Sequence, residues 1–351
     1  MMNGKKSTAP AAQTHEPQPP PGTPDAHLRL CRVDRAWALM GGPDVIDWTG
    51  VTVGQLDTGY TSHPAFGAPA GTWVQTQQAR TFFGTDTTPH GAGGLDPLTG
   101  PNRGHGTGTG STIVGADIAA GFHGVAPRAP LVPVRVCNFV VIDLLEAPFV
   151  QGLNYLVNEV RANVVNISLG GFLLPGTPEA LRAIDNAYDK GTIVVCAAGN
   201  TPFPPTVLTP ARLRRTLAVA GVDPKGAPWS GGSFGDTVDL SAPAVAVRHG
   251  LARDDGTFGY DQGQGTSFAA AMVSGVAALW LARHRDRLAR LYPEPWQRVE
   301  AFRRVVVVSS FVPAGAAWKA GFGAGVLDAA GAMDAGLLPT AAALTADAPN
   351  G

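Results

Sequence analysis

Ser267 is the residue of this chain best placed to act as a nucleophile. It follows two glycines and a threonine in Gly263-Gln264-Gly265-Thr266, and an apolar run with helical character begins directly after it at Phe268. Its hydroxyl is predicted to lie at the N-terminus of a buried helix, where free backbone N–H groups and the helix dipole favour the negative charge of a tetrahedral acyl intermediate. Taken alone, the pattern is more typical of an ordinary helix cap.

Three other side chains complete the chemistry that a nucleophilic serine needs. Asp57 ends an apolar run, His105 stands between two glycines, and Asn200 follows a second apolar run at a sharp turn. Each has a plain structural alternative, namely a turn cap, a solvated loop histidine and a turn asparagine. Together with Ser267 they supply a carboxylate, an imidazole, an amide donor and a hydroxyl, which is the set required for acyl transfer through a covalent intermediate.

Apolar runs that alternate with helical patterns must position these residues. Because the runs are continuous, they indicate strands that are buried on both faces of a parallel sheet. We therefore predict a three-layer α/β fold, a doubly wound and mostly parallel sheet with helices on both faces, whose carboxyl edge gathers the functional side chains. The predicted strands are residues 51–56, near 80–82, 131–136, 164–168, 192–197, 217–222, 238–240 and, at an edge, 305–308; the predicted helices are residues 33–40, 105–116, 149–161, 178–190 and 268–281.

The composition fits one large patterned domain. The 351 residues are 44% hydrophobic and 15% charged, which predicts a sizeable core. The formal net charge of −1 gives no reason to expect a nucleic acid or an anionic membrane as a partner, and no run of about 18 apolar residues predicts a membrane span. We expect a disordered N-terminal tail at residues 1–27, the domain at residues 28–337 and a loose C-terminal tail at residues 338–351.

The three cysteines, Cys31, Cys137 and Cys196, cannot all pair, and their spacing is not that of a metal-binding motif. We expect Cys137 and Cys196 to pack as small apolar side chains because each ends a β-branched run. The N-terminal segment lacks the apolar stretch of a secretory signal, so we expect a cytoplasmic protein.

Three blocks of this sequence resemble the signature blocks of the subtilisin-like serine peptidases. They are Asp57-Thr58-Gly59, Gly104-His105-Gly106-Thr107 and Gly265-Thr266-Ser267, in the order Asp, His, Ser that this family uses. Connecting segments match as well, and the resemblance covers about residues 30 to 337, nearly all of the patterned chain. These segments are residues 124–127, 165–171, 197–200, 238–243 and 323–329.

The resemblance implies a serine endopeptidase and assigns four catalytic roles. Ser267 would attack the scissile carbonyl, and His105 would take its proton and pass it to the leaving amine. Asp57 would hold the imidazole tautomer and stabilise the imidazolium. Asn200, together with the backbone N–H of Ser267, would bind the oxyanion.

The resemblance also implies how a substrate binds. Ser168, Leu169 and Gly170 would pair with the backbone of an extended polypeptide, while Ala198 and Gly199 would form a wall of the S1 pocket. If Leu208 lies at the base of that pocket, it would favour a small or medium apolar P1 residue over lysine or arginine. The expected partner is thus a protein or peptide substrate, and the oligomeric state stays open.

Some residues depart from the family pattern. Ala271 and Met272 replace the usual proline and histidine after the nucleophile, which keeps a peptide ligase or macrocyclase of the same fold as an alternative. A catalytically inactive peptide-binding module is the second alternative. The small residues at 108–111 predict a more flexible helix start and a wider cleft. A Gly-, Pro- and Asp-rich loop at residues 84–102 either flanks the cleft or has no role.

No cofactor is expected, and calcium is not expected at one particular loop. Many secreted members of the family hold a calcium ion with an asparagine in the loop that corresponds to residues 116–122. The matching position here is Ile118, which cannot ligate a metal, although Asp117 is adjacent. We therefore predict no metal site in this loop.

Overall fold

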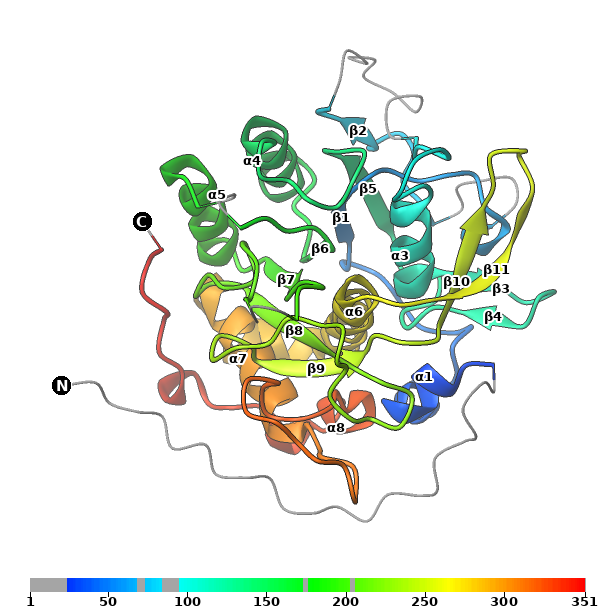
Figure 1. Ribbon diagram of the computed structural model, residues 1–351. Helices are drawn as coiled ribbons and strands as arrows, with labels where there is room; N and C mark the ends of the chain where they lie inside the picture. Colours follow the sequence, from blue (N-terminus) through cyan, green and yellow to red (C-terminus); the bar gives the residue numbers. More distant parts are fainter. Residues whose placement is uncertain (1–23, 68–72, 84–94, 173–175, 203–205, 351) are drawn as a thin grey trace.

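A parallel sheet forms the middle layer of the molecule. The computed structural model describes residues 24–67, 73–83, 95–172, 176–202 and 206–350 (Figure 1). Within these residues, seven strands pair in parallel in the order β2-β5-β1-β6-β7-β8-β9. The strands are β1 (Val53–Asp57), β2 (Arg80–Thr81), β5 (Leu131–Arg135), β6 (Val164–Ile167), β7 (Ile193–Ala197), β8 (Leu217–Val222) and β9 (Leu240–Pro243).

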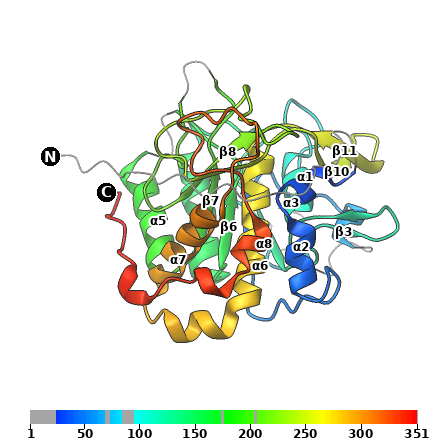
Figure 2. The ribbon, with the colours of Figure 1, turned by 90° about the horizontal axis from the view of Figure 1, so that it is seen from below.

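Helices cover both faces of this sheet, so the predicted three-layer α/β fold is confirmed (Figure 1, Figure 2). One core packs against α4 (Glu146–Asn154), its π-helical continuation η2 (Tyr155–Glu159) and α5 (Pro178–Asp189). The other packs against the remaining helices. These are α1 (Ala26–Leu30), α2 (Val33–Leu39), α3 (His105–Val114), α6 (Thr266–Leu291), α7 (Pro295–Ser309) and α8 (Ala329–Ala332).

Strand β7 shows why the apolar runs are continuous. Its residues Ile193, Val195 and Ala197 lie in one core, whereas Val194 and Cys196 lie in the other. Because successive side chains of a strand point to opposite faces, a strand with helices on both sides needs an apolar residue at every position.

Helix α6 runs through the larger core. By length and composition it is able to cross a membrane, but 89% of its apolar window is buried inside the protein. It packs against β6, β7, β8 and β9, and its N-terminus carries Ser267 (Figure 1). The apolar character of α6 is therefore explained by the core of the domain.

The predicted edge strand at residues 305–308 is wrong, because these residues belong to α7. Pro295 occupies the first turn of this helix, and Glu294 and Gln297 form a reciprocal capping box. Val299, Phe302 and Val306 are buried on one face with helical spacing. Four consecutive valines favour a strand by intrinsic propensity, but capping and burial of one helical face decide the structure.

A hairpin next to the active site was not predicted. Strands β10 (Val247–Ala252) and β11 (Phe258–Gly263) pair with each other in antiparallel fashion, outside the main sheet. Polar and glycine residues interrupt both strands, which hides them in the sequence. A second small ladder joins β3 (Ala116–Asp117) and β4 (Phe122–His123), and short 3-10 turns occur at η1 (Pro64–Phe66), η3 (Ala335–Leu337) and η4 (Ala341–Ala343).

The C-terminal segment is not a loose tail as far as residue 350. Asp347 accepts a hydrogen bond from Arg303 at 2.8 Å and donates one from its backbone N–H to the Tyr188 hydroxyl at 2.8 Å. Asn350 donates to Asp185 at 2.9 Å. Polar contacts to residues far away in the sequence hold this segment in place. Such contacts leave no periodic pattern in the sequence, so they were not predicted. Of the N-terminal tail predicted at residues 1–27, residues 1–23 lie outside the described residues.

Candidate active site

The four predicted catalytic residues stand at the ends of elements that meet at the carboxyl edge of the sheet. Asp57 is the last residue of β1, His105 the first of α3, and Ser267 the second of α6, while Asn200 follows β7. Strand β1 lies beside β6, and α3 packs against α6. The elements that carry the four residues are thus far apart in the sequence but adjacent in the fold (Figure 1).

Asp57 and His105 form the charged pair of the site. The Nδ1 atom of His105 lies 2.7 Å from Oδ1 of Asp57, whose carboxylate is fully buried. Burial alone would lower the pKa of His105, but the charge of Asp57 and its hydrogen bond prevail, so the pKa is raised above its usual value. With the Nδ1 proton directed at Asp57, Nε2 carries the lone pair that a general base needs.

Two glycines make the approach of His105 to Asp57 feasible. A Cβ atom at Gly106 would lie 2.1 Å from the backbone oxygen of Gly59, so α3 begins against the turn that follows β1. Gly59 itself has a φ of +121°, which a side chain would disfavour. Gly106 is thus required by close backbone contact, and Gly59 is required by its backbone conformation.

The hydroxyl of Ser267 rests on the end of β6. Its Oγ donates to the carbonyl oxygen of Ser168 at 3.1 Å, and the Ser168 hydroxyl donates in return to the Ser267 carbonyl at 2.8 Å. For nucleophilic attack, the Ser267 hydroxyl must exchange the Ser168 carbonyl for Nε2 of His105. Such hydrogen bonds are commonly long or misaligned before a substrate binds.

The amide of Asn200 is held in one orientation by Thr266. Its Oδ1 accepts from both the backbone N–H and the hydroxyl of Thr266, each at 3.0 Å. An amide oxygen held by two donors leaves Nδ2 on the exposed side as a donor. The Thr266 hydroxyl also accepts from Gly199 N at 3.0 Å, and Gly265 turns the chain there with a φ of +147°. Thr266 was missed as a positioning residue, although its place in Gly-Thr-Ser was a usable signal.

Comparison with known proteins identifies the family of this chain. The sequence model of the subtilase family matches residues 49–325 of this chain. The chain belongs to the subtilase family.

Two curated relatives illustrate the similarity of this subtilase. The thermostable alkaline protease of Halalkalibacterium halodurans is 33% identical over 235 residues, which are 67% of this chain and 58% of that protein. The major intracellular serine protease of Bacillus subtilis (strain 168) is 30% identical over 261 residues, which are 73% of this chain and 76% of that protein. The chain thus spans under two thirds of the length of the first of these relatives.

A solved structure supports the fold of this subtilase. A protease from Pseudoalteromonas arctica PAMC 21717 aligns with a TM-score of 0.68 at 24% identity, and the alignment covers 86% of this chain and 93% of that one. At this identity, the likeness concerns the fold.

Asp96 is a buried carboxylate that the sequence analysis did not select. It accepts from the Thr58 hydroxyl at 2.6 Å, and from the backbone N–H and the hydroxyl of Thr107 at 2.7 and 2.8 Å. Burial raises the pKa of Asp96 to about 6, although these hydrogen bonds act in the opposite direction. Asp96 therefore links Thr58, the residue after Asp57, to Thr107 in α3. No sequence spacing marks it, because it lies at the end of a long loop.

Gly170, one of the residues expected to pair with substrate, is hydrogen-bonded within the chain. Gly170 donates to Val140 O at 3.0 Å and accepts from Ile142 N at 3.2 Å. Its neighbour Gly171 exchanges two backbone hydrogen bonds with Thr209. Gly170 is therefore not a free edge in this state, and an extended substrate pairs with it only after residues 140–142 move away. The segment after β5 was not predicted to cover this edge.

Leu208 lies between Gly199 and Gly170. A Cβ atom at Gly199 would lie 2.7 Å from Cγ of Leu208, and one at Gly170 would lie 3.0 Å from Cβ of Leu208. The backbone N–H of Leu208 donates to Ala198 O at 2.8 Å. Residues 203–205, which precede Leu208 in the chain, lie outside the described residues.

The residues that depart from the family pattern are packed in the interior of the protein. Ala271 and Met272 are fully buried in the continuous helix α6 and so lie in the core. At Gly108 an added Cβ would lie 3.1 Å from the His249 ring, so the small residues of α3 do not widen the cleft. All residues from Gly106 to Val114 are buried. Of the loop at 84–102, residues 84–94 lie outside the described residues.

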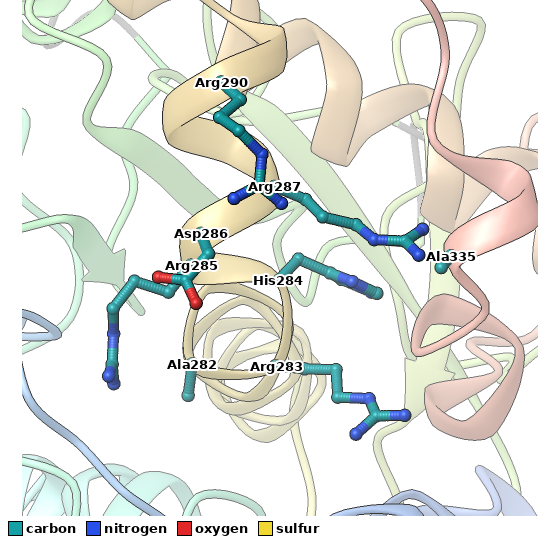
Figure 3. A pocket seen from close by; sticks show the side chains of 8 residues that line it. All are labelled: Ala282, Arg283, His284, Arg285, Asp286, Arg287, Arg290 and Ala335. Carbon is teal, nitrogen blue, oxygen red and sulfur yellow. The ribbon is translucent and has the colours of Figure 1, made fainter.

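A separate hollow lies at the other end of α6. Figure 3 shows the side chains of Arg283, Arg287 and Arg290 extending from the helix around a cavity of about 340 Å³. At 1.5 Å per residue, these arginines are roughly 24 to 35 Å along the helix from Ser267. Cationic side chains near a helix C-terminus interact favourably with the helix dipole. This hollow is not part of the active site.

Proposed function

We propose that this chain is a serine endopeptidase that cleaves extended polypeptides through an acyl-enzyme on Ser267. The observation that carries this proposal is the 2.7 Å hydrogen bond between His105 and the buried carboxylate of Asp57, at the N-terminus of the helix that packs against the Ser267 helix. The family membership and the serine protease relatives support the same reaction.

The residues account for each proton in the reaction. Ser267 Oγ passes its proton to Nε2 of His105 as it attacks the scissile carbonyl carbon, and Asp57 stabilises the imidazolium that forms. The oxyanion accepts hydrogen bonds from Asn200 Nδ2 and from the backbone N–H of Ser267. His105 then protonates the leaving amine, the C–N bond breaks, and a water molecule activated by His105 hydrolyses the ester.

We further propose that the S1 pocket accepts small or medium apolar P1 residues and disfavours lysine and arginine. Leu208 fills the space between Gly199, which is expected to form a wall of the S1 pocket, and Gly170, which is expected to pair with the substrate backbone. Its isobutyl group leaves little depth and offers no counter-charge. Efficient cleavage after lysine or arginine in a peptide library would refute this preference.

The loop at residues 116–122 is proposed to function without calcium. Oδ2 of Asp117 accepts from the Tyr260 hydroxyl at 2.6 Å, and Oδ1 accepts from Ala120 N at 3.2 Å, so both oxygens are engaged. Ile118 is 66% exposed, and its side chain offers no ligand atom. We expect equal melting temperatures in calcium and in a chelator. A calcium-dependent rise that is lost in Asp117→Ala would contradict the proposal.

We also propose that the protein is cytoplasmic. Its proposed partners are protein or peptide substrates. Cys31, Cys137 and Cys196 are buried free thiols, which suits a reducing compartment. The intracellular relative in Bacillus subtilis points the same way. Fractionation of the source cells checks the location, and recovery of the protein from the medium would contradict it.

One experiment tests the proposed reaction against its two alternatives. The wild type and Ser267→Ala are incubated with a peptide library, with and without an added amine nucleophile, and the products are identified by mass spectrometry. We expect hydrolysed peptides from the wild type and none from Ser267→Ala. Ligated products in excess over hydrolysed ones would instead indicate a ligase, and an inactive wild type would indicate a binding module.

A further inference from the structure

Two buried polar side chains, Gln55 and Thr109, lie beside the catalytic carboxylate. Both are fully buried, Gln55 in β1 and Thr109 in α3. Because Gln55 and Asp57 are two positions apart in a strand, their side chains point to the same face, toward α3. Gln55 Nε2 donates to Thr109 Oγ1 and to Gly106 O, each at 2.8 Å.

Thr109 contacts the oxygen of Asp57 that His105 does not use. Oδ1 of Asp57 receives His105 Nδ1 and the backbone N–H of Thr58, each at 2.7 Å. Thr109 Oγ1 lies 3.1 Å from Oδ2. Across the described part of the chain, no other donor is within hydrogen-bond distance of Oδ2. Without Thr109, half of a buried charged group would lack a partner, which is costly.

The single hydrogen of the Thr109 hydroxyl has three acceptors within reach. One is Asp57 Oδ2, and the others are the backbone carbonyls of His105 at 3.0 Å and Gly106 at 3.4 Å, contacts that threonines commonly make inside helices. Gln55 Nε2 donates to Thr109 Oγ1, so the hydrogen of the Thr109 hydroxyl points away from Gln55. Hydrogen bonds to an ionised acceptor are about twice as strong as neutral ones, which favours Asp57.

Gln55 is held at a cost to the protein. Its Oε1 is buried and has no partner among the described residues. Gly110 makes room for this oxygen, since a Cβ atom there would lie 2.8 Å from it. A buried, partly unsatisfied amide destabilises a core, whereas a hydrocarbon side chain of similar size would not. Its retention is explained if Nε2 is needed to orient Thr109.

We propose that Thr109 is a positioning residue that fixes the carboxylate of Asp57 toward His105, and that Gln55 holds the Thr109 hydroxyl in place. This inference rests on the proposed peptidase function. Donation to Oδ2 sets the plane of the carboxylate so that Oδ1 faces Nδ1 of His105. It also compensates part of the carboxylate charge beside the imidazole.

The first test compares Thr109→Val, which keeps the shape but removes the hydroxyl, with Thr109→Ser, which restores it. We expect Thr109→Val to lower kcat about 10- to 100-fold, as loss of a hydrogen bond to a charged group does, with KM within about twofold of wild type. In Thr109→Val, less of the negative charge of Asp57 is compensated, which raises the pKa of His105. The acid limb of the pH profile of kcat/KM therefore moves to higher pH. Thr109→Ser should restore both readouts. An unchanged kcat and limb in Thr109→Val would overturn the proposal.

A matched control lies on the same helix. Thr112 is also buried and donates its hydroxyl to a backbone carbonyl one turn back, Gly108 O at 3.1 Å. Thr112→Val should therefore leave kcat and the acid limb unchanged. The other titratable groups near Asp57 and His105, which are Asp96, Cys137 and His249, stay the same in every variant. If Thr112→Val shifts the limb as far as Thr109→Val, the proposal is wrong.

A double variant separates positioning from stability. Thr109→Val alone leaves Gln55 Nε2 with only Gly106 O as an acceptor and Oδ2 of Asp57 without a donor, so the melting temperature should fall. Gln55→Leu combined with Thr109→Val removes the unpaired amide, so the melting temperature should recover in part while the activity loss and the shifted limb persist. Recovery of kcat together with stability would show that the pair is only structural.

A readout independent of catalysis distinguishes this inference from the function itself. The titration of the His105 ring is followed by NMR in the wild type and in Thr109→Val. A higher pKa in the variant supports the positioning role even if the wild type cleaves no peptide, in which case the proposed function alone fails. An unchanged His105 titration in an active enzyme would overturn the positioning role alone.

Discussion

Side-chain hydrogen bonds hold the residues around His105, whereas backbone hydrogen bonds hold the segments around Gly170. In the first region, Asp57 is connected to His105 and Thr109, and Asn200 is connected to Thr266, in each case through side-chain atoms. In the second, Gly170 and Gly171 pair with residues 140–142 and 209 through peptide groups. A single substitution therefore acts on the chemistry in the first region and on the shape of the cleft in the second.

The largest expected effect is that of Asp57→Asn. The carboxamide would favour the wrong tautomer of His105, so kcat should fall about 10⁴-fold with the fold intact. Steady-state kinetics on a peptide ester near pH 8 measures this effect. Asp47→Asn is a matched control, because Asp47 pairs with Arg285 at the surface. A loss below tenfold in Asp57→Asn would mean that the side-chain network does not control catalysis.

Asn200→Ala should lower kcat about 10²- to 10³-fold, because its Nδ2 donates to the oxyanion that forms only during the reaction. KM should change little, since the ground-state carbonyl is not held in the same way. Separate determination of kcat and KM tests this. A raised KM with an unchanged kcat would instead place Asn200 in the substrate-binding region.

The same contrast explains what the sequence revealed. Asp57, His105, Asn200 and Ser267 each stand at the end of a recognisable strand or helix, so their positions follow from the pattern and the order of the blocks. Gln55, Thr109 and Asp96 act through partners tens of residues away, and their types carry no periodic signal. Likewise, no local pattern shows that residues 140–142 pair with Gly170.

The prediction of secondary structure failed where the local preference of the residues and their packing disagree. The valines at 305–308 favour a strand, yet the cap at Glu294 and the buried face of α7 make them helical. The hairpin of β10 and β11 was missed because glycine and charged residues interrupt it. The main sheet was predicted because burial on both faces leaves an unbroken apolar run.

Leu208→Gly should change selectivity by a smaller factor. It opens the space between Gly170 and Gly199, so the ratio of kcat/KM for P1 phenylalanine to that for P1 alanine should rise about 10- to 100-fold. Parallel assays on two peptides that differ only at P1 measure the ratio. An unchanged ratio, in a variant with a normal circular dichroism spectrum, would remove Leu208 from the S1 pocket.

Asp96→Asn should act on stability more than on rate. The pKa of Asp96 is about 6 in the folded protein, against 3.8 ordinarily, so its protonation stabilises the fold below about pH 4. That contribution, about 2–3 kcal/mol, is lost as the pH rises through 6. The free energy of unfolding from urea titrations at pH 4 and 7 should therefore differ less in Asp96→Asn than in the wild type. Equal differences would contradict the raised pKa.

The most direct test of the account is covalent labelling of Ser267 by a fluorophosphonate, located by peptide mass spectrometry. We expect one label on Ser267 in the wild type, a much slower reaction in His105→Ala, and none at this peptide in Ser267→Ala. An unlabelled wild type, or labelling of Ser267→Ala to the same extent, would show that Ser267 is not an activated nucleophile.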